Sequence, residues 1–243
     1  MQRIKTGVPG LDEITRGGIP DGHTVLLIGP AGSGKTILCS QFLYSGAKLY
    51  KEPGVYLSFE ESSESIKKNA MNFGWDFGPL ENDDIISFVK YDAYHADELM
   101  TSLESRIREV EAKRVVIDSI SALSFYLRET TEFRRVIFKI GQILSKLGCT
   151  SILVSESVPN NPCASRNSVE EFVADTSVIL YYVRQDSAYT RALQVWKMRG
   201  SAHSEKIHPY KIGAKGIEIN PQQDFLMKGY PITPKYSGIQ AVE

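Results

Sequence analysis

A glycine-rich segment near the N-terminus carries the residue types that bind phosphate. It reads Gly-Pro-Ala-Gly-Ser-Gly-Lys-Thr over residues 29–36. It follows a short apolar run, residues 25–28, and precedes apolar residues at helical spacing, so we expect it in a strand-to-helix turn. In such a turn, successive backbone N–H groups form an anion-binding concavity, and the positive end of the helix points into it. The pattern predicts a site for a nucleoside triphosphate.

Individual side chains of this loop have separate predicted roles. Lys35 would reach the β- and γ-phosphates, and the Thr36 hydroxyl would be a ligand of Mg²⁺. The alternative is an ordinary glycine-rich loop that happens to end in Lys-Thr, but the complete pattern between a strand and a helix favours phosphate binding. The nucleotide-binding residues predicted in the loop are Gly32, Ser33, Gly34, Lys35 and Thr36.

A carboxylate stands at the end of another apolar run. Residues 115–117 read Val-Val-Ile, and Asp118 follows them. Ligands of parallel sheets bind at the carboxyl ends of the strands, so Asp118 is expected to hold Mg²⁺, directly or through water. It could instead merely end the strand. The next residue is Ser119 and not Glu, so the carboxylate that orients an attacking water must come from elsewhere.

The best source of that carboxylate is the acidic pair Glu60 and Glu61. It ends the strand expected at residues 55–59, which follows the phosphate-binding helix. Successive residues of a strand point to opposite faces, so the two carboxylates cannot meet one water equally. We assign Glu60 as the base and Glu61 as a supporting or magnesium-side carboxylate. The alternative is a solvated acidic pair that stabilises the start of the next helix through its dipole.

Two cations lie two residues apart in a later strand pattern. Lys197 and Arg199 would therefore lie on one face of the strand, where they could neutralise phosphate charge together. Taken alone, the pair is more typical of an exposed strand face. His203, taken alone, is more typical of a surface histidine than of a ligand.

The elements that must position these residues follow a βα alternation and then a β meander. We expect strands at residues 25–28, 55–59, 85–89, 115–118, 151–155, 178–183, 190–199, 207–212 and 216–219. Residues 119–131 and 156–170 are expected to be loops. The prediction is an α/β fold with a mainly parallel central sheet flanked by helices and extended by a C-terminal β meander. Residues 1–219 would form one domain and residues 220–243 a tail.

Composition places limits on function and location. The 243 residues suit one sizeable α/β domain, and Lys+Arg 28 against Asp+Glu 29 gives a net charge of −1. No global field therefore favours nucleic acid. The three cysteines form no Cys-x-x-Cys pair and suggest free thiols. No run is long enough to span a bilayer and no signal pattern opens the chain, so we expect a soluble, cytoplasmic protein without membrane association.

With these residues in place, the chain resembles the KaiC-like branch of the RecA-type P-loop ATPases. The matching stretches are Thr-Gly-Val-Pro-Gly-Leu-Asp-Glu from residue 6, the glycine-rich loop, Phe-Glu-Glu-Ser from residue 59 and Lys-Asn-Ala-Met-Asn-Phe-Gly-Trp from residue 68. Three further stretches match: Ile-Asp-Ser from residue 117, Val-Glu-Glu-Phe-Val-Ala-Asp from residue 169 and Lys-Met-Arg-Gly-Ser-Ala-His from residue 197. Together they cover most of residues 3–219.

The resemblance implies a homo-oligomer, a hexameric ring with Mg-ATP bound between subunits. It makes Glu60 and Glu61 catalytic and directs four residues toward the nucleotide of the neighbouring subunit: Lys197, Arg199, Ser201 and His203. Two departures matter. The clock protein of this family has two such domains, whereas this chain has room for one. Its phosphorylated Ser-Thr pair is replaced here by Glu171 and Phe172, so autophosphorylation at that site is not supported.

Three functions fit these observations. The first, which we favour, is a slow regulatory ATPase that converts ATP and water to ADP and phosphate. The second is a DNA recombination or repair ATPase. The two expected loops offer it only Arg128 and Arg166 as cations, with Phe125 and Tyr126 as aromatic residues. The third is a nucleotide-gated interaction module with little turnover, whose protein partner the sequence does not identify.

Overall fold

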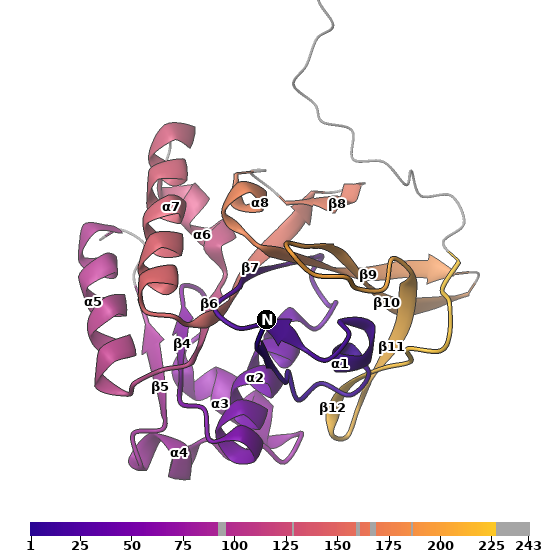
Figure 1. The fold of residues 1–243 in the computed structure, drawn as a ribbon, viewed down its shortest axis with the longest axis horizontal. Helices are drawn as coiled ribbons and strands as arrows, with labels where there is room; N and C mark the ends of the chain where they lie inside the picture. The colour runs from indigo at the N-terminus through magenta and orange to yellow at the C-terminus, as the bar shows by residue number, and fades with distance from the viewer. Residues whose placement is uncertain (92–95, 128, 159–160, 166–168, 186, 227–243) are drawn as a thin grey trace, which may run out of the picture.

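The computed structural model describes residues 1–91, 96–127, 129–158, 161–165, 169–185 and 187–226. A central sheet runs through the molecule and has helices on both faces (Figure 1). The strands are β1 (Arg3–Ile4), β2 (Ile19–Pro20), β3 (Thr24–Gly29), β4 (Gly54–Ser58), β5 (Ile86–Lys90), β6 (Arg114–Asp118), β7 (Thr150–Val158), β8 (Asn161–Ser165), β9 (Thr176–Gln185), β10 (Ala188–Met198), β11 (Ile207–Gly213) and β12 (Gly216–Ile219). The helices are α1 (Leu11–Ile14), α2 (Lys35–Ser45), which continues as a π-helical turn (Gly46–Tyr50), α3 (Ser63–Met71), α4 (Gly78–Asn82), α5 (Ala96–Glu109), α6 (Ile120–Tyr126), α7 (Thr130–Lys146) and α8 (Glu170–Val173).

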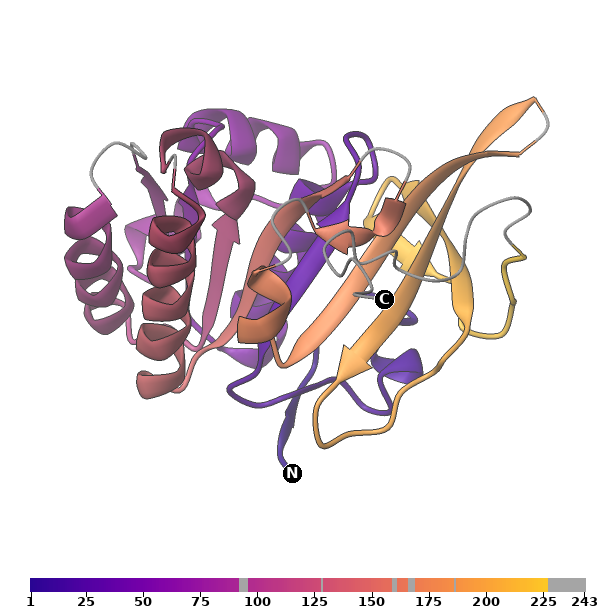
Figure 2. The ribbon, with the colours of Figure 1, turned by 90° about the horizontal axis from the view of Figure 1, so that it is seen from above.

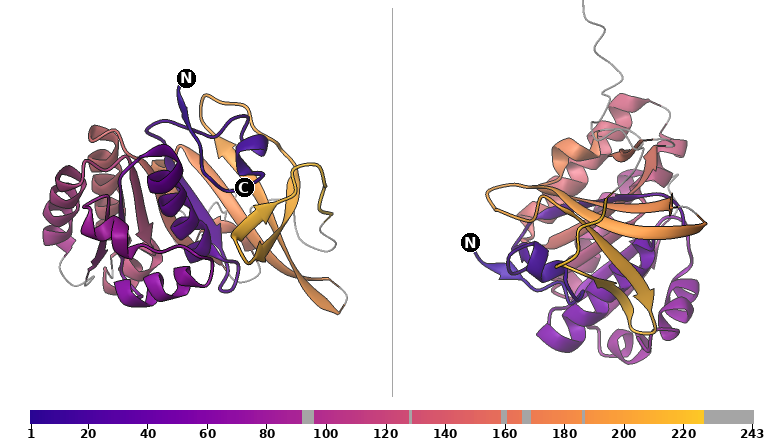
Figure 3. Two further views of the ribbon diagram at one scale, coloured as in Figure 1. Left: turned by 90° about the horizontal axis from the view of Figure 1, so that it is seen from below. Right: turned by 90° about the vertical axis from the view of Figure 1, so that its right-hand side faces the viewer.

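The sheet is parallel at its centre and antiparallel at one edge. Its order is β12-β11-β10-β9-β3-β7-β6-β4-β5, with β8 paired to β7 beside this path. The neighbours in the series β9-β3-β7-β6-β4-β5 pair in parallel. The neighbours in the series β9-β10-β11-β12 pair antiparallel. Figures 2 and 3 show the β9–β10 hairpin projecting from the rest of the sheet. This arrangement confirms the predicted α/β fold with a C-terminal meander.

Alternate residues of the buried strands pack against different helices. In β3, Val25 and Leu27 face a core that also contains side chains of α1, α2 and α3. Leu26 and Ile28 face the opposite core, which contains side chains of α5, α6 and α7. Burial on both faces explains why the central strands are continuous apolar runs. Within the described residues, no helix is long and apolar enough to cross a membrane.

The prediction of a loop at residues 119–131 is wrong for residues 120–126 and 130–131, which belong to α6 and α7. Arg128, the cation predicted in this loop, lies outside the described residues. Ser119 precedes α6 in an extended conformation, and Ile120, Leu123 and Leu127 are buried. Ile120 and Leu123 lie on one side of α6 and Leu127 follows the helix, and all three pack into the core that also contains side chains of α7. The residues that follow the predicted magnesium ligand are therefore held by the core.

The prediction of a loop at residues 156–170 is also wrong for residues 156–158, 161–165 and 170, which belong to β7, β8 and α8. Residues 159–160 and 166–168, with the predicted cation Arg166, lie outside the described residues. β7 continues to Val158, and β8 folds back on it with Ser157 opposite Ser165. Pro162 lies in β8, which pairs beside the main sheet. Proline is tolerated in strands at the margin of a sheet, where its missing N–H costs no ladder bond.

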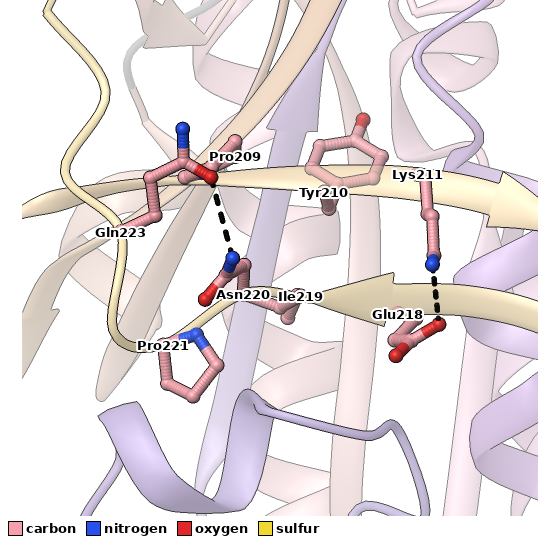
Figure 4. A pocket seen from close by; sticks show the side chains of 8 residues that line it. All are labelled: Pro209, Tyr210, Lys211, Glu218, Ile219, Asn220, Pro221 and Gln223. Carbon is pink, nitrogen blue, oxygen red and sulfur yellow. Dashed lines mark hydrogen bonds and ion pairs between the residues drawn. The ribbon is translucent and has the colours of Figure 1, made fainter.

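Part of the predicted tail lies against the meander. The Asn220 N–H donates to the Pro209 carbonyl (2.9 Å), and the Phe225 N–H donates to the Ile207 carbonyl (2.8 Å). Residues 209–211, 218–221 and 223 border a groove of about 460 Å³ between this segment and β11 and β12 (Figure 4). The remainder of the predicted tail, residues 227–243, lies outside the described residues.

Candidate nucleotide site

The glycine-rich loop joins β3 to α2, as its sequence predicts. Gly32 and Gly34 have φ angles of +79° and +91°, which disfavour residues with a Cβ atom. A Cβ atom on Gly34 would lie 2.9 Å from Cδ1 of Ile212, so the Ile212 side chain would have to move to admit a larger residue. The Ser33 hydroxyl donates to the Pro30 carbonyl (2.8 Å), which braces the turn from within. The loop is thus a tightly packed turn that ends at the N-terminus of an 11-residue helix.

A cavity of about 370 Å³ opens over this turn. It is lined by Ala31, Gly32, Gly34, Lys35, Thr36, Ile37, Glu60, Asp118, Ser119, Glu156, Arg191 and Ile212. These residues come from the ends of β3, β4, β6 and β7 and from the C-terminal meander. The cavity therefore lies at the carboxyl ends of the parallel strands, where sheets of this kind bind ligands.

Thr36 and Asp118 lie together on one side of the cavity. The Thr36 hydroxyl donates to Oδ2 of Asp118 (2.9 Å), and the Tyr56 hydroxyl donates to the same oxygen (2.7 Å). Burial raises the pKa of Asp118, and the hydrogen bonds from Tyr56 and Thr36 oppose that shift. A hydroxyl and a carboxylate are hard oxygen donors, so this pair suits Mg²⁺ held mainly by phosphates and water.

Glu60 and Glu61 point to different surroundings. The Ser119 hydroxyl donates to Oε1 of Glu60 (2.6 Å), and the Glu60 side chain lines the cavity. Glu61 is exposed and accepts a hydrogen bond from the Ser65 hydroxyl (3.0 Å) at the start of α3. Only Glu60 of the pair is among the residues that line the cavity.

Lys35 lies in the field of several carboxylates. Its Nζ donates to the Gly29 and Pro30 carbonyls, at 2.9 and 3.1 Å. Burial lowers the pKa of this ammonium group, and the charges of Asp118 and Glu156 oppose the shift. The two hydrogen bonds to carbonyls hold the Lys35 ammonium group against the start of the glycine-rich loop.

Arg191 and Glu156 also line the cavity and were not predicted from the sequence. The Arg191 guanidinium donates twice to the Gly32 carbonyl (3.0 and 3.2 Å) and lies 4.3 Å from the Tyr182 ring centroid. Glu156 lies beside Gly29 in the register of β7 and β3. Its place at the end of a predicted strand was a usable signal, whereas Arg191 reaches the loop through hairpin geometry that no local pattern reveals.

Lys197, Arg199, Ser201 and His203 are not part of this cavity. They lie at the opposite end of β3, because Met198 pairs with Thr176, which in turn pairs with Val25. Lys197 Nζ donates to the Glu171 and Ala174 carbonyls, and Arg199 donates to the Phe172 carbonyl. Both cations therefore point toward α8, on one side as predicted, and donate to backbone carbonyls in and just after this helix.

The remaining two predicted residues lie close to this cluster. The Ser201 hydroxyl accepts a hydrogen bond from Arg3, and Nδ1 of His203 lies 2.8 Å from the Ser204 carbonyl oxygen. Arg199 also forms an ion pair with Asp175 (3.2 Å), yet its side chain remains 53% exposed. An arginine that is paired but half-exposed in this way is accessible to a second molecule.

Comparisons with known proteins find relatives that match most of the chain. A family model described as "ATPase: KaiC" matches residues 4–224. A UPF0273 protein of Thermotoga maritima is 39% identical over 240 residues, which cover 92% of this chain and 98% of the relative. The circadian clock oscillator protein KaiC of Thermosynechococcus vestitus is 34% identical over 231 residues, covering 91% of this chain but 44% of the clock protein.

A solved structure has a similar fold over most of the chain. The crystal structure of a KaiC-like protein from Pyrococcus horikoshii is 37% identical and superposes with a TM-score of 0.85, covering 90% of this chain and 99% of that one. The chain therefore belongs to the KaiC family of RecA-fold ATPases, as the resemblance of its sequence predicts.

Proposed function

We propose that this protein hydrolyses ATP to ADP and phosphate, with Mg²⁺ as cofactor. The observation that carries the proposal is the convergence of Lys35, Thr36, Asp118 and Glu60 on one cavity above the glycine-rich turn. These four side chains supply a phosphate-binding cation, two metal-side oxygens and a carboxylate for water. Lys35 and Thr36 belong to α2, Asp118 ends β6 and Glu60 follows β4, so their convergence is a property of the fold.

The backbone N–H groups of the turn and the Lys35 ammonium would hold the β- and γ-phosphates. Bound Mg²⁺ would neutralise phosphate charge, with the Thr36 hydroxyl and Asp118 on its protein side. Arg191 and Ile212 line the cavity on the side of the meander. A planar guanidinium and an apolar side chain suit the face of a purine, so we place the base of the nucleotide there.

Glu60 is the group proposed to orient the attacking water. Its Oε1 atom accepts a hydrogen bond from Ser119, which fixes the direction of the carboxylate toward the cavity. The carboxylate would accept a proton from the water as the oxygen approaches the γ-phosphorus. Phosphoryl transfer of this kind depends mainly on positioning and on neutralising charge in the transition state.

We further propose that neighbouring copies complete each site, in a ring that the sequence resemblance suggests is hexameric. This proposal is supported by the position of Lys197 and Arg199, which lie near the start of β3, whereas the glycine-rich turn follows its end. The Arg199 side chain is also half-exposed. Both cations could therefore reach a nucleotide held by another copy, together with Ser201 and His203. Cations supplied in trans stabilise the charge of the transition state.

Phosphate release tests the catalytic assignment. Glu60→Gln should lower the turnover of ATP by about 10²-fold or more, because it removes the base, and should leave nucleotide binding nearly unchanged. Glu61→Gln is the matched control, since Glu61 lies next to Glu60 but outside the cavity lining, and its loss should be smaller. The same assay measures whether turnover is slow. Equal rates for Glu60→Gln and the unmodified protein would show that the assignment is wrong.

A further inference from the structure

The hydroxyl of Tyr56 has no part in the reaction as described so far. It belongs to β4, is fully buried, and donates to Oδ2 of Asp118 at 2.7 Å. The same oxygen accepts the Thr36 hydroxyl at 2.9 Å. One carboxylate oxygen therefore receives two hydroxyl donors, one from a proposed metal ligand and one from a core residue.

The register of the sheet brings Tyr56 to this oxygen. β4 and β6 pair in parallel, with Ser58 opposite Asp118 and Tyr56 opposite Val116. Residues two apart on a strand share a face, so Tyr56 and Asp118 lie on the same side of the sheet as diagonal neighbours. A long aromatic side chain can span such a diagonal.

The ring of Tyr56 is held by other aromatic residues. It stacks on Phe88 of β5, with ring centroids 5.4 Å apart and an interplanar angle of 16°. Phe88 in turn contacts the ring of Phe77 edge-on at 5.0 Å and 82°. Aromatic pairs in these geometries have preferred orientations, so the stack fixes the direction of the Tyr56 hydroxyl.

A fixed donor on Asp118 restricts the rotation of its carboxylate. Mg²⁺ requires near-octahedral geometry and tolerates misplaced oxygens poorly. Groups that orient a metal ligand without touching the metal commonly change affinity or activity by 10- to 100-fold when they are removed. Tyr56 is placed to exert such an effect through Asp118.

We propose that Tyr56 is a positioning residue, which orients the Asp118 carboxylate for Mg²⁺ through its hydroxyl. The proposal rests on the function proposed above, since it requires that Mg²⁺ and nucleotide bind beside Asp118. It goes beyond that function by assigning a core side chain to the metal side of the site.

The test is the Mg²⁺ dependence of nucleotide binding, measured at equilibrium with a fluorescent ADP analogue and without turnover. Tyr56→Phe keeps the ring and removes the hydroxyl, and should raise the Mg²⁺ concentration for half-maximal binding by about 10-fold. Binding in EDTA should change by less than about twofold, because the hydroxyl acts on the metal side. Phe88→Leu is a second variant, which keeps the hydroxyl but loosens the ring, and should shift the same curve less.

Tyr181→Phe is the matched control. Tyr181 is also a buried tyrosine, and its hydroxyl donates to Oε1 of Gln194 (2.8 Å) in the opposite core. It should leave the Mg²⁺ curve unchanged. In an Asp118→Asn background, Tyr56→Phe should add no further shift, because the carboxylate that it orients is gone.

The outcomes separate the two proposals. If the unmodified protein binds nucleotide in a Mg²⁺-dependent way and neither Tyr56→Phe nor Phe88→Leu moves the curve, the role of Tyr56 is wrong and the proposed function stands. An equal shift in Tyr181→Phe would likewise overturn it, since the effect would then be general loosening of the core. If the unmodified protein shows no Mg²⁺-dependent nucleotide binding, both proposals are wrong.

Discussion

The Tyr210 hydroxyl of β11 donates a hydrogen bond to the backbone carbonyl of Ser33 in the glycine-rich turn. A second contact joins the same parts of the chain, because the Gln41 side chain of α2 exchanges two hydrogen bonds with the backbone of Ile217, at 2.8 and 3.1 Å. The C-terminal hairpin therefore braces both the turn and the helix that follows it. The turn that is proposed to bind phosphate therefore depends on a distant segment of the chain, since Tyr210 and Ser33 are 177 residues apart.

Removing the Tyr210 hydroxyl should weaken nucleotide binding. Tyr210→Phe keeps the buried ring and deletes one hydrogen bond to the turn, so we expect the Kd for ATP to rise roughly threefold to tenfold. Equilibrium binding of a fluorescent ATP analogue measures this. Tyr181→Phe again serves as the control, and an unchanged Kd in Tyr210→Phe would contradict a bracing role.

Arg199→Ala should lower ATP turnover by about 10³-fold or more, if cations supplied by a neighbour stabilise the transition state. Nucleotide binding should change little, because Arg199 lies at the other end of β3 from the turn. Phosphate release and equilibrium binding separate the two effects. Arg106→Ala, on the exposed face of α5, is the control. Full turnover in Arg199→Ala would rule out the shared site.

The pH dependence of stability should reflect Asp118. Burial raises its pKa in the folded chain, so between the ordinary and the raised value the folded chain binds the proton more tightly than the unfolded chain does. Its contribution to stability is therefore greatest below the ordinary pKa and falls as pH rises through the window. Asp118→Asn should thus stabilise the nucleotide-free protein at neutral pH. Urea unfolding at several pH values tests this, and a gain that grew toward acid pH would contradict it.

Arg114 should be important for stability without being part of the site. Its side chain is fully buried, pairs with Glu52 (2.5 Å), and donates to the carbonyls of Phe42 (2.8 Å) and Lys5 (2.6 Å). Arg114→Met leaves these acceptors without their donor, so we expect a loss of roughly 3 kcal/mol in the free energy of unfolding. Urea denaturation measures the loss. The exposed Arg106→Ala should stay within about 0.5 kcal/mol of the unmodified protein.

The positions of residues that directly follow an apolar strand could be predicted from the sequence. The turn, Asp118 and Glu60 each follow an apolar strand, and parallel strands bring their carboxyl ends to one edge. The meander was also predictable, because β-branched and aromatic residues recur between turn residues in that part of the chain.

Contacts that depend on the tilt and register of the hairpins could not be predicted in the same way. Arg191 reaches Gly32 across 159 positions, and its direction follows from how β10 pairs with β9. Residues 156–170 carry breakers that favour a loop, yet pairing with β7 outweighs that local preference in β8. The contacts of Tyr56 with Asp118 and of Tyr210 with Ser33 likewise depend on which strands are neighbours in the sheet.

Arg199 and Lys35 lie at opposite ends of β3, and this has a consequence for mixtures of variants. If each site takes its loop from one copy and its cations from the next, two inactive variants can rescue one another. Copies with Lys35→Ala still supply cations, and copies with Arg199→Ala still supply the loop. In an equal mixture that exchanges freely around head-to-tail contacts, about one site in four would be intact, and activity should reappear from two silent preparations.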